Sequence, residues 1–318
     1  MKVAVIGTGF GKHAAAPAYR GLRLDVEVIS PRDEQAVKRA LASDVNLVSV
    51  HSPPFMHLDH VTGAIEHGHA VLCDKPFGRN ADEAAAMRER AGEAGVLHFL
   101  NFEFRCNESW AKIKQLTDAG TIGTPAHLSW NFFGSGLRSR KYGWINDRDL
   151  GGGWIGAYGS HLIDFTRWLF NSEVTECGGI TRIEEPKHPD EDGSPRTATA
   201  EDAYSAWFVM ENGCTATHDT AFAAAIPMTP RVAVMGSAGS IELIGDTKLV
   251  VHRVGKEPET FEFGMPPRRT PPPALSSFLG QVAEAVRTGT QISPSFDDGV
   301  ATAQAMDRLR ANAIRATG

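Results

Sequence analysis

Cysteine is scarce in this sequence. Only four of the 318 residues are cysteines, and they are scattered along the chain with no C-x-x-C pair among them. A few dispersed cysteines predict neither a disulfide framework nor a zinc site, so we expect no bound metal. The four are Cys73, Cys106, Cys177 and Cys214.

Long apolar runs and basic clusters are also missing. No stretch approaches the roughly 20 uninterrupted apolar residues that a membrane span requires. Met1 is followed at once by a predicted strand, which leaves no room for a signal peptide, so we expect a cytoplasmic protein with no membrane partner. The formal net charge is -6. Because phosphate contacts need clustered Lys and Arg, we expect no nucleic-acid partner either.

The most informative stretch lies at the N-terminus. An apolar run at residues 2–6 is too short for a helix, and it meets the glycine cluster Gly7, Thr8, Gly9, Phe10, Gly11 and then an alanine-rich segment. The order strand, tight turn, helix is the opening of a dinucleotide-binding fold, whose glycines let the backbone approach a pyrophosphate at the helix N-terminus. The third glycine of G-x-G-x-x-G would fall at Lys12, while Gly11 stands one residue early. We assign residues 7–11 to cofactor binding.

The end of the second predicted strand, residues 24–30, bears on the choice of dinucleotide. Such folds usually carry a carboxylate there for the ribose hydroxyls, but this chain has Ser30, with Arg32 two residues later. A carboxylate would repel a 2′-phosphate, whereas a serine with a nearby arginine suits one. We therefore predict NADP as the preferred cofactor and NAD as the alternative, in which case Arg32 is only a solvated surface residue.

The pattern of predicted strands and helices changes once along the chain. Up to residue 122, strand patterns alternate with helical ones, which predicts βαβ units and a doubly wound parallel sheet. From residue 123 to residue 318, strands separated by glycine-bearing turns predict an α/β domain with a large open, mostly antiparallel sheet and two C-terminal helices. We expect an exposed loop at residues 184–195 and a stiff proline-rich connector at residues 266–273.

Two stretches are not explained by packing. The first is Asp74-Lys75-Pro76, at the end of a buried strand, where a lysine is expensive to hold without a partner. If the glycine loop holds the phosphates, Lys75 would stand beside the nicotinamide. The second is the glycine run at residues 151–153 and the helix that follows it.

On that helix, Tyr158, His161 and Asp164 are spaced three apart and share a face. Asp164 is suited to orient the His161 ring, and an imidazole titrates near neutrality, as a group that takes and returns a proton must. The alternative is that His161 is a satisfied core histidine. His57, Asp59 and His60 do not form a metal site in this interpretation, because Asp59 lies off the face that the histidines share.

Taken together, these motifs resemble the Gfo/Idh/MocA oxidoreductases. The resemblance rests on Gly7 to Gly11, on Asp74-Lys75-Pro76 where the family has Glu-Lys-Pro, and on the glycine run leading to His161 and Asp164. It covers essentially the whole chain, including residues 199–202 and the turn at residues 236–240.

The resemblance implies a Rossmann domain, residues 1–122, followed by a substrate-binding and oligomerisation domain, residues 123–318, whose sheet joins copies into a homodimer or homotetramer. It implies hydride transfer between NAD(P) and a hydroxyl-bearing carbon of a sugar, inositol or related polyol. Lys75 matches the lysine that contacts both substrate and cofactor, and His161 matches the acid/base. By the same match, Ser52, Pro53, His57 and Asp74 are cofactor contacts, and the bond before Pro76 is expected to be cis.

The chain departs from the family at Ala157. Many members carry an aspartate there, four residues before the histidine, and a methyl group neither accepts a substrate hydrogen bond nor tunes the imidazole. We therefore expect Tyr158 to supply a substrate contact. The departure also leaves open a second hypothesis, a non-catalytic regulator that senses a dinucleotide or sugar with the same fold.

Overall fold

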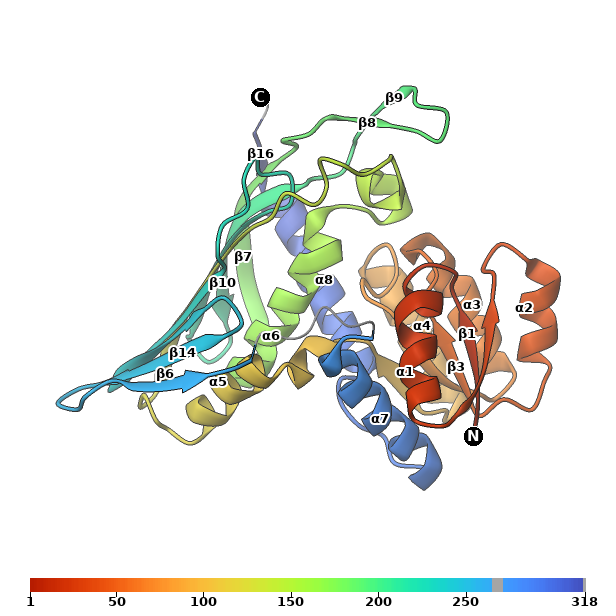
Figure 1. The fold of residues 1–318 in the computed structure, drawn as a ribbon, viewed down its shortest axis with the longest axis horizontal. Helices are drawn as coiled ribbons and strands as arrows, with labels where there is room; N and C mark the ends of the chain where they lie inside the picture. The colour runs from red at the N-terminus through yellow and green to blue at the C-terminus, as the bar shows by residue number, and fades with distance from the viewer. Residues whose placement is uncertain (265–270, 317–318) are drawn as a thin grey trace. The chain divides into compact units, whose positions relative to one another are not determined.

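The computed structural model describes residues 1–264 and 271–316, which form two compact units (Figure 1). Unit 1 comprises Met1–Cys106 and Pro266–Gln304, and unit 2 comprises Asn107–Met265 and Ala305–Gly318. The units therefore divide after Cys106, whereas the expected boundary lay between residues 122 and 123. A C-terminal segment also groups with unit 1, although the sequence pattern assigns it to the second domain.

Unit 1 is built on a five-stranded parallel sheet with the strand order β2-β1-β3-β4-β5, which confirms the predicted doubly wound sheet. The order reverses between β1 and β3, and open α/β sheets bind ligands at such a switch point. The strands are β1 (Lys2–Ile6), β2 (Asp25–Ile29), β3 (Leu47–Val50), β4 (Ala70–Cys73) and β5 (His98–Leu100). The helices and helical turns that lie wholly in this unit are η1 (Gly11–Ala15), α1 (Ala16–Gly21), α2 (Glu34–Leu41), η2 (Pro54–Met56), α3 (His57–Glu66), α4 (Ala81–Ala94), η3 (Glu103–Cys106) and α7 (Pro273–Thr288).

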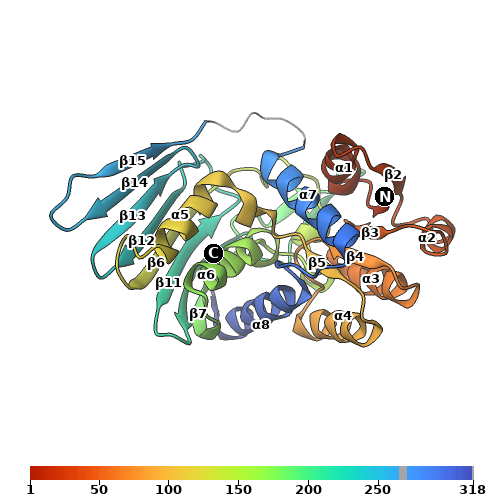
Figure 2. The ribbon, with the colours of Figure 1, turned by 90° about the horizontal axis from the view of Figure 1, so that it is seen from below.

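The core of unit 1 explains why the C-terminal segment belongs to it. Tyr19 of α1 and Phe278 of α7 are fully buried in one cluster with sheet residues such as Val5. Helix α7 has proline in its first turn and ends at Gly289 in the left-handed region, so its ends are defined locally. Figure 2 shows α1 and α7 on one side of the sheet and α3 and α4 on the other.

Unit 2 is built on a nine-stranded mixed sheet with the order β15-β14-β13-β12-β6-β11-β10-β7-β16. Only the pairs β6·β11 and β7·β16 are parallel, so the prediction of a large, mostly antiparallel sheet is confirmed. The strands are β6 (Pro125–Phe133), β7 (Val174–Arg182), β10 (Ala203–Met210), β11 (Thr215–Ala221), β12 (Arg231–Gly236), β13 (Gly239–Ile244), β14 (Lys248–Arg253), β15 (Glu259–Glu262) and β16 (Ile314–Arg315).

Helices cover one face of this sheet. They are α5 (Glu108–Asp118) and α6 (Ser160–Phe170), which lie along the sheet in Figure 1. Trp110 of α5, Phe165 of α6 and Trp130 of β6 meet edge to face with ring centroids 4.4 to 5.6 Å apart. No described helix of unit 2 lies on the other face, where Trp207 of β10 and Met235 of β12 keep 46% and 48% of their surface exposed.

Four further observations complete the description of the fold. The predicted exposed loop at residues 184–195 contains a short hairpin of β8 (Lys187–Pro189) and β9 (Pro195–Thr197). Helix α8 (Phe296–Asn312) carries the chain from unit 1 into unit 2. Most of the predicted connector at residues 266–273 lies outside the described residues. Among the described helices, none combines the length and apolar character needed to cross a membrane.

Candidate active site

The glycine loop occupies the switch point of the unit 1 sheet. It follows β1 and leads into η1, and its first glycine packs directly against the residue after β3. A Cβ added to Gly7 would lie 2.6 Å from the backbone oxygen of His51, so only glycine fits there without a shift. A Cβ on Gly11 would lie 3.0 Å from both Val5 and His51, and this glycine thus allows the close helix–strand packing that the third glycine of the motif provides.

Gly9 differs from these two glycines. A Cβ at this position would meet no protein atom within 4 Å, so packing within the protein gives no reason for glycine here. A pyrophosphate drawn to the helix N-terminus would give one, because it brings the backbone amides into contact with the ligand. Thr8 and Phe10 on either side are exposed. The loop therefore fits the dinucleotide that the sequence predicts.

Directly after β2 the chain has Ser30, Pro31 and Arg32, and so no carboxylate at the position where such folds usually bind the ribose. The Ser30 hydroxyl accepts a hydrogen bond from the Arg32 amide at 3.4 Å, and the Arg32 side chain is exposed. The nearest carboxylate, Asp33, caps α2 by accepting from the Ala36 amide at 2.9 Å. The Asp33 carboxylate is thus engaged in capping the helix.

A buried chain of hydrogen bonds links three strand ends beside the loop. Tyr19 lies 3.0 Å from the hydroxyl of Ser49, which lies 2.8 Å from Nε2 of His51. Nδ1 of His51 donates to Oδ2 of Asp74 at 2.8 Å, because a carboxylate can only accept. The other Asp74 oxygen accepts from Asn101 at 2.7 Å.

These contacts decide the charge of Asp74. Burial by itself raises the pKa of the carboxyl group, but His51, Asn101 and Lys75 outweigh burial and lower it. Asp74 is therefore an anion at neutral pH, held by two donors immediately before Lys75. The bond between Lys75 and Pro76 is cis, which confirms the expectation from the family.

Lys75 and Glu103 form an electrostatically coupled pair in unit 1. Burial lowers the pKa of Lys75, and Glu103 and Asp74 oppose the shift. Burial raises the pKa of Glu103 to about 7, against the attraction of Lys75. The sequence alone left the direction of the lysine shift open, and the structure shows that burial prevails.

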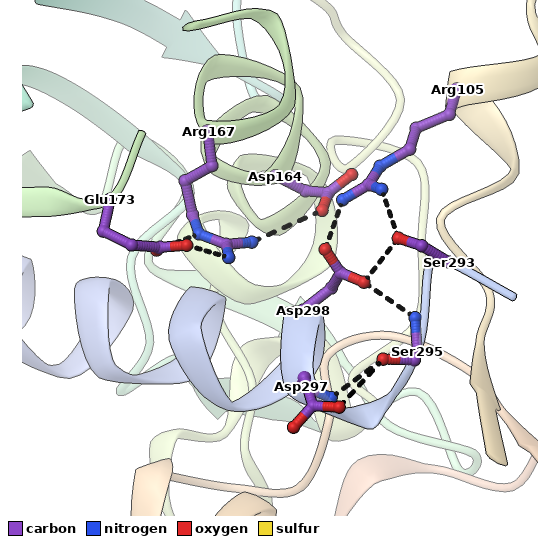
Figure 3. A network of polar contacts seen from close by, with 8 residues as sticks. All are labelled: Arg105, Asp164, Arg167, Glu173, Ser293, Ser295, Asp297 and Asp298. Atoms are coloured by element: carbon purple, nitrogen blue, oxygen red, sulfur yellow. Dashed lines mark hydrogen bonds and ion pairs between the residues drawn. The ribbon is translucent and has the colours of Figure 1, made fainter. Parts of the chain in front are cut away.

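Arg105 of the η3 turn, which also carries Glu103, binds the first turn of α8 and the segment before it (Figure 3). Arg105 pairs with Asp298 at 2.7 Å and donates to Ser293 at 2.9 Å. Asp298 also accepts from the hydroxyl of Ser293 and from the amide of Ser295, each at 2.8 Å. Glu103 therefore sits on a turn whose position is set by a charged network.

Ser52 and His57 lie in the segment that follows β3, shortly after His51 in the chain. His57 is fully buried and donates from Nε2 to the carbonyl of Ser52 at 2.7 Å. Burial lowers the pKa of His57 to about 4, so the ring is neutral. His60 lies 2.9 Å from the Ser52 hydroxyl, and Pro53 follows in extended conformation. His57 thus holds the backbone of the predicted cofactor loop in place.

In unit 2, the glycine run is anchored to the segment before β10. Gly153 has φ of 106°, and a Cβ there would overlap the carboxylate of Glu201. The backbone carbonyl of Glu201 accepts a hydrogen bond from the backbone amide of Trp154 at 2.7 Å. The carboxylate of Glu201 forms an ion pair with the guanidinium of Arg310 at 3.1 Å. Arg310 also donates to the carbonyl of Gly152 at 3.0 Å. The run therefore enters the next helix from a rigid base.

The three predicted residues of unit 2 follow this base. Tyr158 lies in a π-helical turn, η6 (Ile155–Gly159), and its ring packs between Trp154 and Phe132 with centroids 4.9 and 4.6 Å away. His161 and Asp164 are buried in α6. Asp164 lies 3.8 Å from Arg167, which is bound by both carboxylate oxygens of Glu173 (Figure 3).

Of the aromatic residues around the run, Trp154 is a packing residue. It stacks on Phe222 with a centroid distance of 4.2 Å and an interplanar angle of 6°. Tyr142 instead bonds Asp147 at 3.1 Å and lies under the guanidinium of Arg196. The described residues hold no group of three or more His, Cys, Asp or Glu side chains arranged to bind a metal ion.

Sequence reasoning missed several residues of these two sets. In unit 1 it did not single out His51, Asn101 or Glu103, and in unit 2 it did not single out Arg310. A usable signal existed for two of them, since His51 and Asn101 each directly follow a predicted strand and strand ends collect ligand-binding groups. The predicted residues fall into two sets, one in each unit, from residue 7 to residue 75 and from residue 158 to residue 164.

Comparison with known proteins identifies both halves of the chain. A model described as "Oxidoreductase family, NAD-binding Rossmann fold" matches residues 1–102. A model described as "GFO/IDH/MocA C-terminal domain" matches residues 110–242. Both models carry the same family name, and they follow one another in the order expected for one polypeptide.

Individual relatives agree with the family models. An uncharacterized oxidoreductase of Synechocystis sp. is 29% identical over 223 residues, which cover 64% of this chain and 60% of that protein. Glucose-6-phosphate 3-dehydrogenase of Bacillus subtilis is 31% identical over 131 residues, 40% of this chain and 37% of that protein. The aligned segments thus span about 60% or less of these relatives' lengths.

Solved structures show the same fold over nearly the full length. Levoglucosan dehydrogenase in complex with NADH superposes with a TM-score of 0.86 at 19% identity and covers 98% of this chain and 96% of that one. At this identity the likeness establishes the fold alone.

Proposed function

Because the chain belongs to the Gfo/Idh/MocA oxidoreductase family, we propose that it transfers a hydride between a nicotinamide dinucleotide and a hydroxyl-bearing carbon of a sugar, inositol or related polyol. The observation that carries the proposal is the arrangement at the switch point of unit 1. Gly7 packs on His51, His51 bonds Asp74, and Asp74 precedes a lysine whose pKa burial has lowered. A partly buried lysine with a shifted pKa beside a predicted dinucleotide loop is a marker of chemistry.

The roles of the side chains follow from their chemistry. When bound, the dinucleotide supplies the hydride acceptor at its nicotinamide ring. We propose that His161 takes the proton of the substrate hydroxyl and that Lys75 donates a hydrogen bond to the same oxygen. Burial lowers the pKa of Lys75 and so makes its ammonium a stronger acid than that of an exposed lysine, while Glu103 and Asp74 oppose this shift. Tyr158 and Asp164 are proposed substrate contacts.

The proposed cofactor is NADP in preference to NAD. The supporting observation is that Ser30 replaces a ribose-binding carboxylate and that Asp33 is committed to capping α2. Arg32, exposed beside them, is suited to a 2′-phosphate through bidentate hydrogen bonds. The other proposed cofactor contacts are Thr8, Phe10, Ser52, Pro53 and His57.

Assembly through the sheet is proposed as well. The face of the unit 2 sheet that carries no described helix exposes Trp207 and Met235 among small polar side chains. Exposed apolar groups on an open sheet mark association surfaces. We propose that copies of the chain form a homodimer or homotetramer through this face.

The catalytic proposal is tested by turnover of Lys75→Ala and His161→Ala. The wild type is screened on sugars and polyols by the absorbance of the reduced nicotinamide, and each variant is expected to lose about 10²-fold or more of kcat/KM on an accepted substrate. The exposed residues Lys38 and His252 provide matched controls, as Lys38→Ala and His252→Ala. Near wild-type kcat/KM in both site variants would refute the assigned roles.

The same screen separates the second hypothesis. A wild-type chain that binds the dinucleotide and turns over no member of the panel would favour a sensor of dinucleotide or sugar. Ala157 is the residue that favours this reading, because it provides no carboxylate four residues before His161. Restoring an aspartate with Ala157→Asp would then be expected to leave such a chain inactive.

A further inference from the structure

A cavity of about 470 Å³ lies in unit 2, between the end of β7, strand β16 and the segment before β10. Its volume is typical of a site for a small molecule. None of the residues that line it belongs to the proposed catalytic or cofactor set. The titratable residues of its wall are Arg148, Arg182, Glu184, Glu201, Arg310 and Arg315.

The charges of this wall do not balance. Arg182 pairs with Glu184 at 2.8 Å, and Arg310 pairs with Glu201 at 3.1 Å. Within residues 1–264 and 271–316, the guanidinium groups of Arg148 and Arg315 form no ion pair or hydrogen bond with a protein group. Both carboxylates of the wall are thus neutralised, and two positive charges remain.

The geometry around the two unpaired arginines is firmly held. The amide of Arg148 donates to the hydroxyl oxygen of Thr199 at 2.9 Å, which fixes the turn at residues 148–150. Arg315 lies in β16, and its backbone is paired in register with Thr181 of β7. Thr181 and Thr199 also line the cavity, so its wall carries two hydroxyl groups as well as the arginines.

We propose that this cavity binds a small dianion, either a phosphoryl group or a dicarboxylate. Arg148 and Arg315 supply the charge, because a planar guanidinium donates bidentate hydrogen bonds to both kinds of oxyanion. Two free guanidinium groups match two negative charges, and the threonine hydroxyls complete the donor set. A neutral sugar would leave both charges without a partner.

Binding in this cavity has a consequence for the glycine run. Arg310 and Glu201 line the cavity and also hold Gly152 and Gly153, which lead into η6 and α6. A ligand that bridges the remaining arginines ties β16 and residues 148–150 to this wall. The ligand therefore stabilises the folded chain, and the stabilisation grows with the logarithm of ligand concentration once this exceeds the dissociation constant.

The test is calorimetric titration of the intact chain with inorganic phosphate and, separately, with malonate. Chloride keeps the ionic strength constant, and pH is fixed. We expect saturable binding of at least one dianion with a matching rise in melting temperature. Arg148→Gln and Arg315→Gln should each weaken it at least tenfold, whereas Arg39→Gln, at an exposed arginine of α2, should bind as the wild type does.

Unequal responses assign the ligand class, since tighter phosphate binding indicates a phosphoryl ligand and tighter malonate binding a dicarboxylate. Circular dichroism of each variant confirms that it is folded. The proposal is overturned if neither anion saturates, or if both glutamine variants bind with wild-type affinity. The latter result would place the anion elsewhere, for example at the Gly7–Gly11 loop, which these substitutions do not touch.

Discussion

Single side chains in unit 1 have charge states that their residue type alone would not suggest. Asp74 is anionic although it is partly buried, because His51, Asn101 and Lys75 outweigh the effect of burial on its pKa. Glu103 is the opposite case, since burial raises its pKa to about 7 even though Lys75 is near. Two carboxyl groups near one lysine thus have pKa values that are pushed apart, as in many acid/base sites.

The pKa of Glu103 predicts how stability depends on pH. A glutamate in an unfolded chain ionises near pH 4.3, whereas folded Glu103 keeps its proton up to about pH 7. Between these values the unfolded chain binds fewer protons, so the unfolding free energy falls as pH rises. Glu103→Gln should therefore gain stability relative to the wild type across this window, by on the order of 3 kcal/mol.

The measurement is urea unfolding of wild type and Glu103→Gln from pH 4.5 to pH 7.5. His57, with its pKa lowered to about 4, contributes in the opposite sense, because its stabilisation is lost as pH falls from 6.5 toward 4. It is present in both proteins and cancels in the difference. The prediction would be contradicted if the unfolding free energies of the wild type and Glu103→Gln differed by the same amount at every pH. Glu89→Gln, at an exposed glutamate, serves as the control.

Arg32 determines the proposed cofactor preference. Arg32→Ala is expected to reduce kcat/KM for NADP about 10- to 100-fold, because it removes a charge-assisted bidentate contact to the 2′-phosphate. The value for NAD should change little. Comparison of the two cofactors on one substrate measures the effect, and equal losses with both would mean that Arg32 does not recognise the phosphate. Arg39→Ala, an exposed arginine of α2, is the matched control.

Short elements, rather than whole helices, position the predicted groups. The glycine loop at residues 7–11 and the glycine run at residues 151–153 each lead into a helix through a π-helical turn, η1 before α1 and η6 before α6. Such turns are rare and concentrate at functional sites. The short turn η3 also positions a charged group. The ion pair between Arg105 and Asp298 holds this turn, and Glu103 on the same turn interacts electrostatically with Lys75.

The glycine loop yields a matched pair of substitutions. Gly7→Ala should destabilise the chain by about 1–3 kcal/mol, because its Cβ would collide with the backbone of His51. Gly9→Ala should leave the unfolding free energy within about 0.5 kcal/mol, since the added atom meets no protein. It should nevertheless raise KM for the dinucleotide at least tenfold. Denaturant unfolding and steady-state kinetics measure both effects, and an unchanged KM would show that Gly9 does not face the cofactor.

At the scale of the whole molecule, the bare face of the unit 2 sheet predicts assembly. Trp207→Glu should shift the chain from oligomer to monomer, because it places a charge on the proposed interface. Ile226→Glu is the control, since Ile226 is 77% exposed and lies outside any strand. Light scattering coupled to size-exclusion chromatography measures the mass. A wild-type chain that is monomeric at micromolar concentration would contradict the proposal.

The division into units shows where local patterns stop being informative. Helix α7 is amphipathic, begins at a proline and ends at a left-handed glycine, so its existence was predictable from residues 275–287. The core that it completes was not, because Phe278 and Val5 are 273 positions apart in the chain and meet only in the folded state. The expected boundary after residue 122 assumed that neighbours in sequence share a core.

The same contrast holds for the candidate site. Asp74, Lys75, His161 and the glycine loop were recognisable because each lies in a short motif whose meaning is local. The residues that set their charge and position, among them His51, Glu103 and Glu201, carry no motif of their own.

The sequence by itself predicted most of the strands and helices, the glycine loop and the family, because period-2 and glycine patterns are properties of adjacent residues. The tertiary structure alone decided which strand ends meet, that burial lowers the pKa of Lys75, and that Arg148 and Arg315 line one cavity. The physical reason is that desolvation and Coulomb interactions depend on distance in space, and the parallel sheet brings together strand ends that are separated by whole helices in the chain.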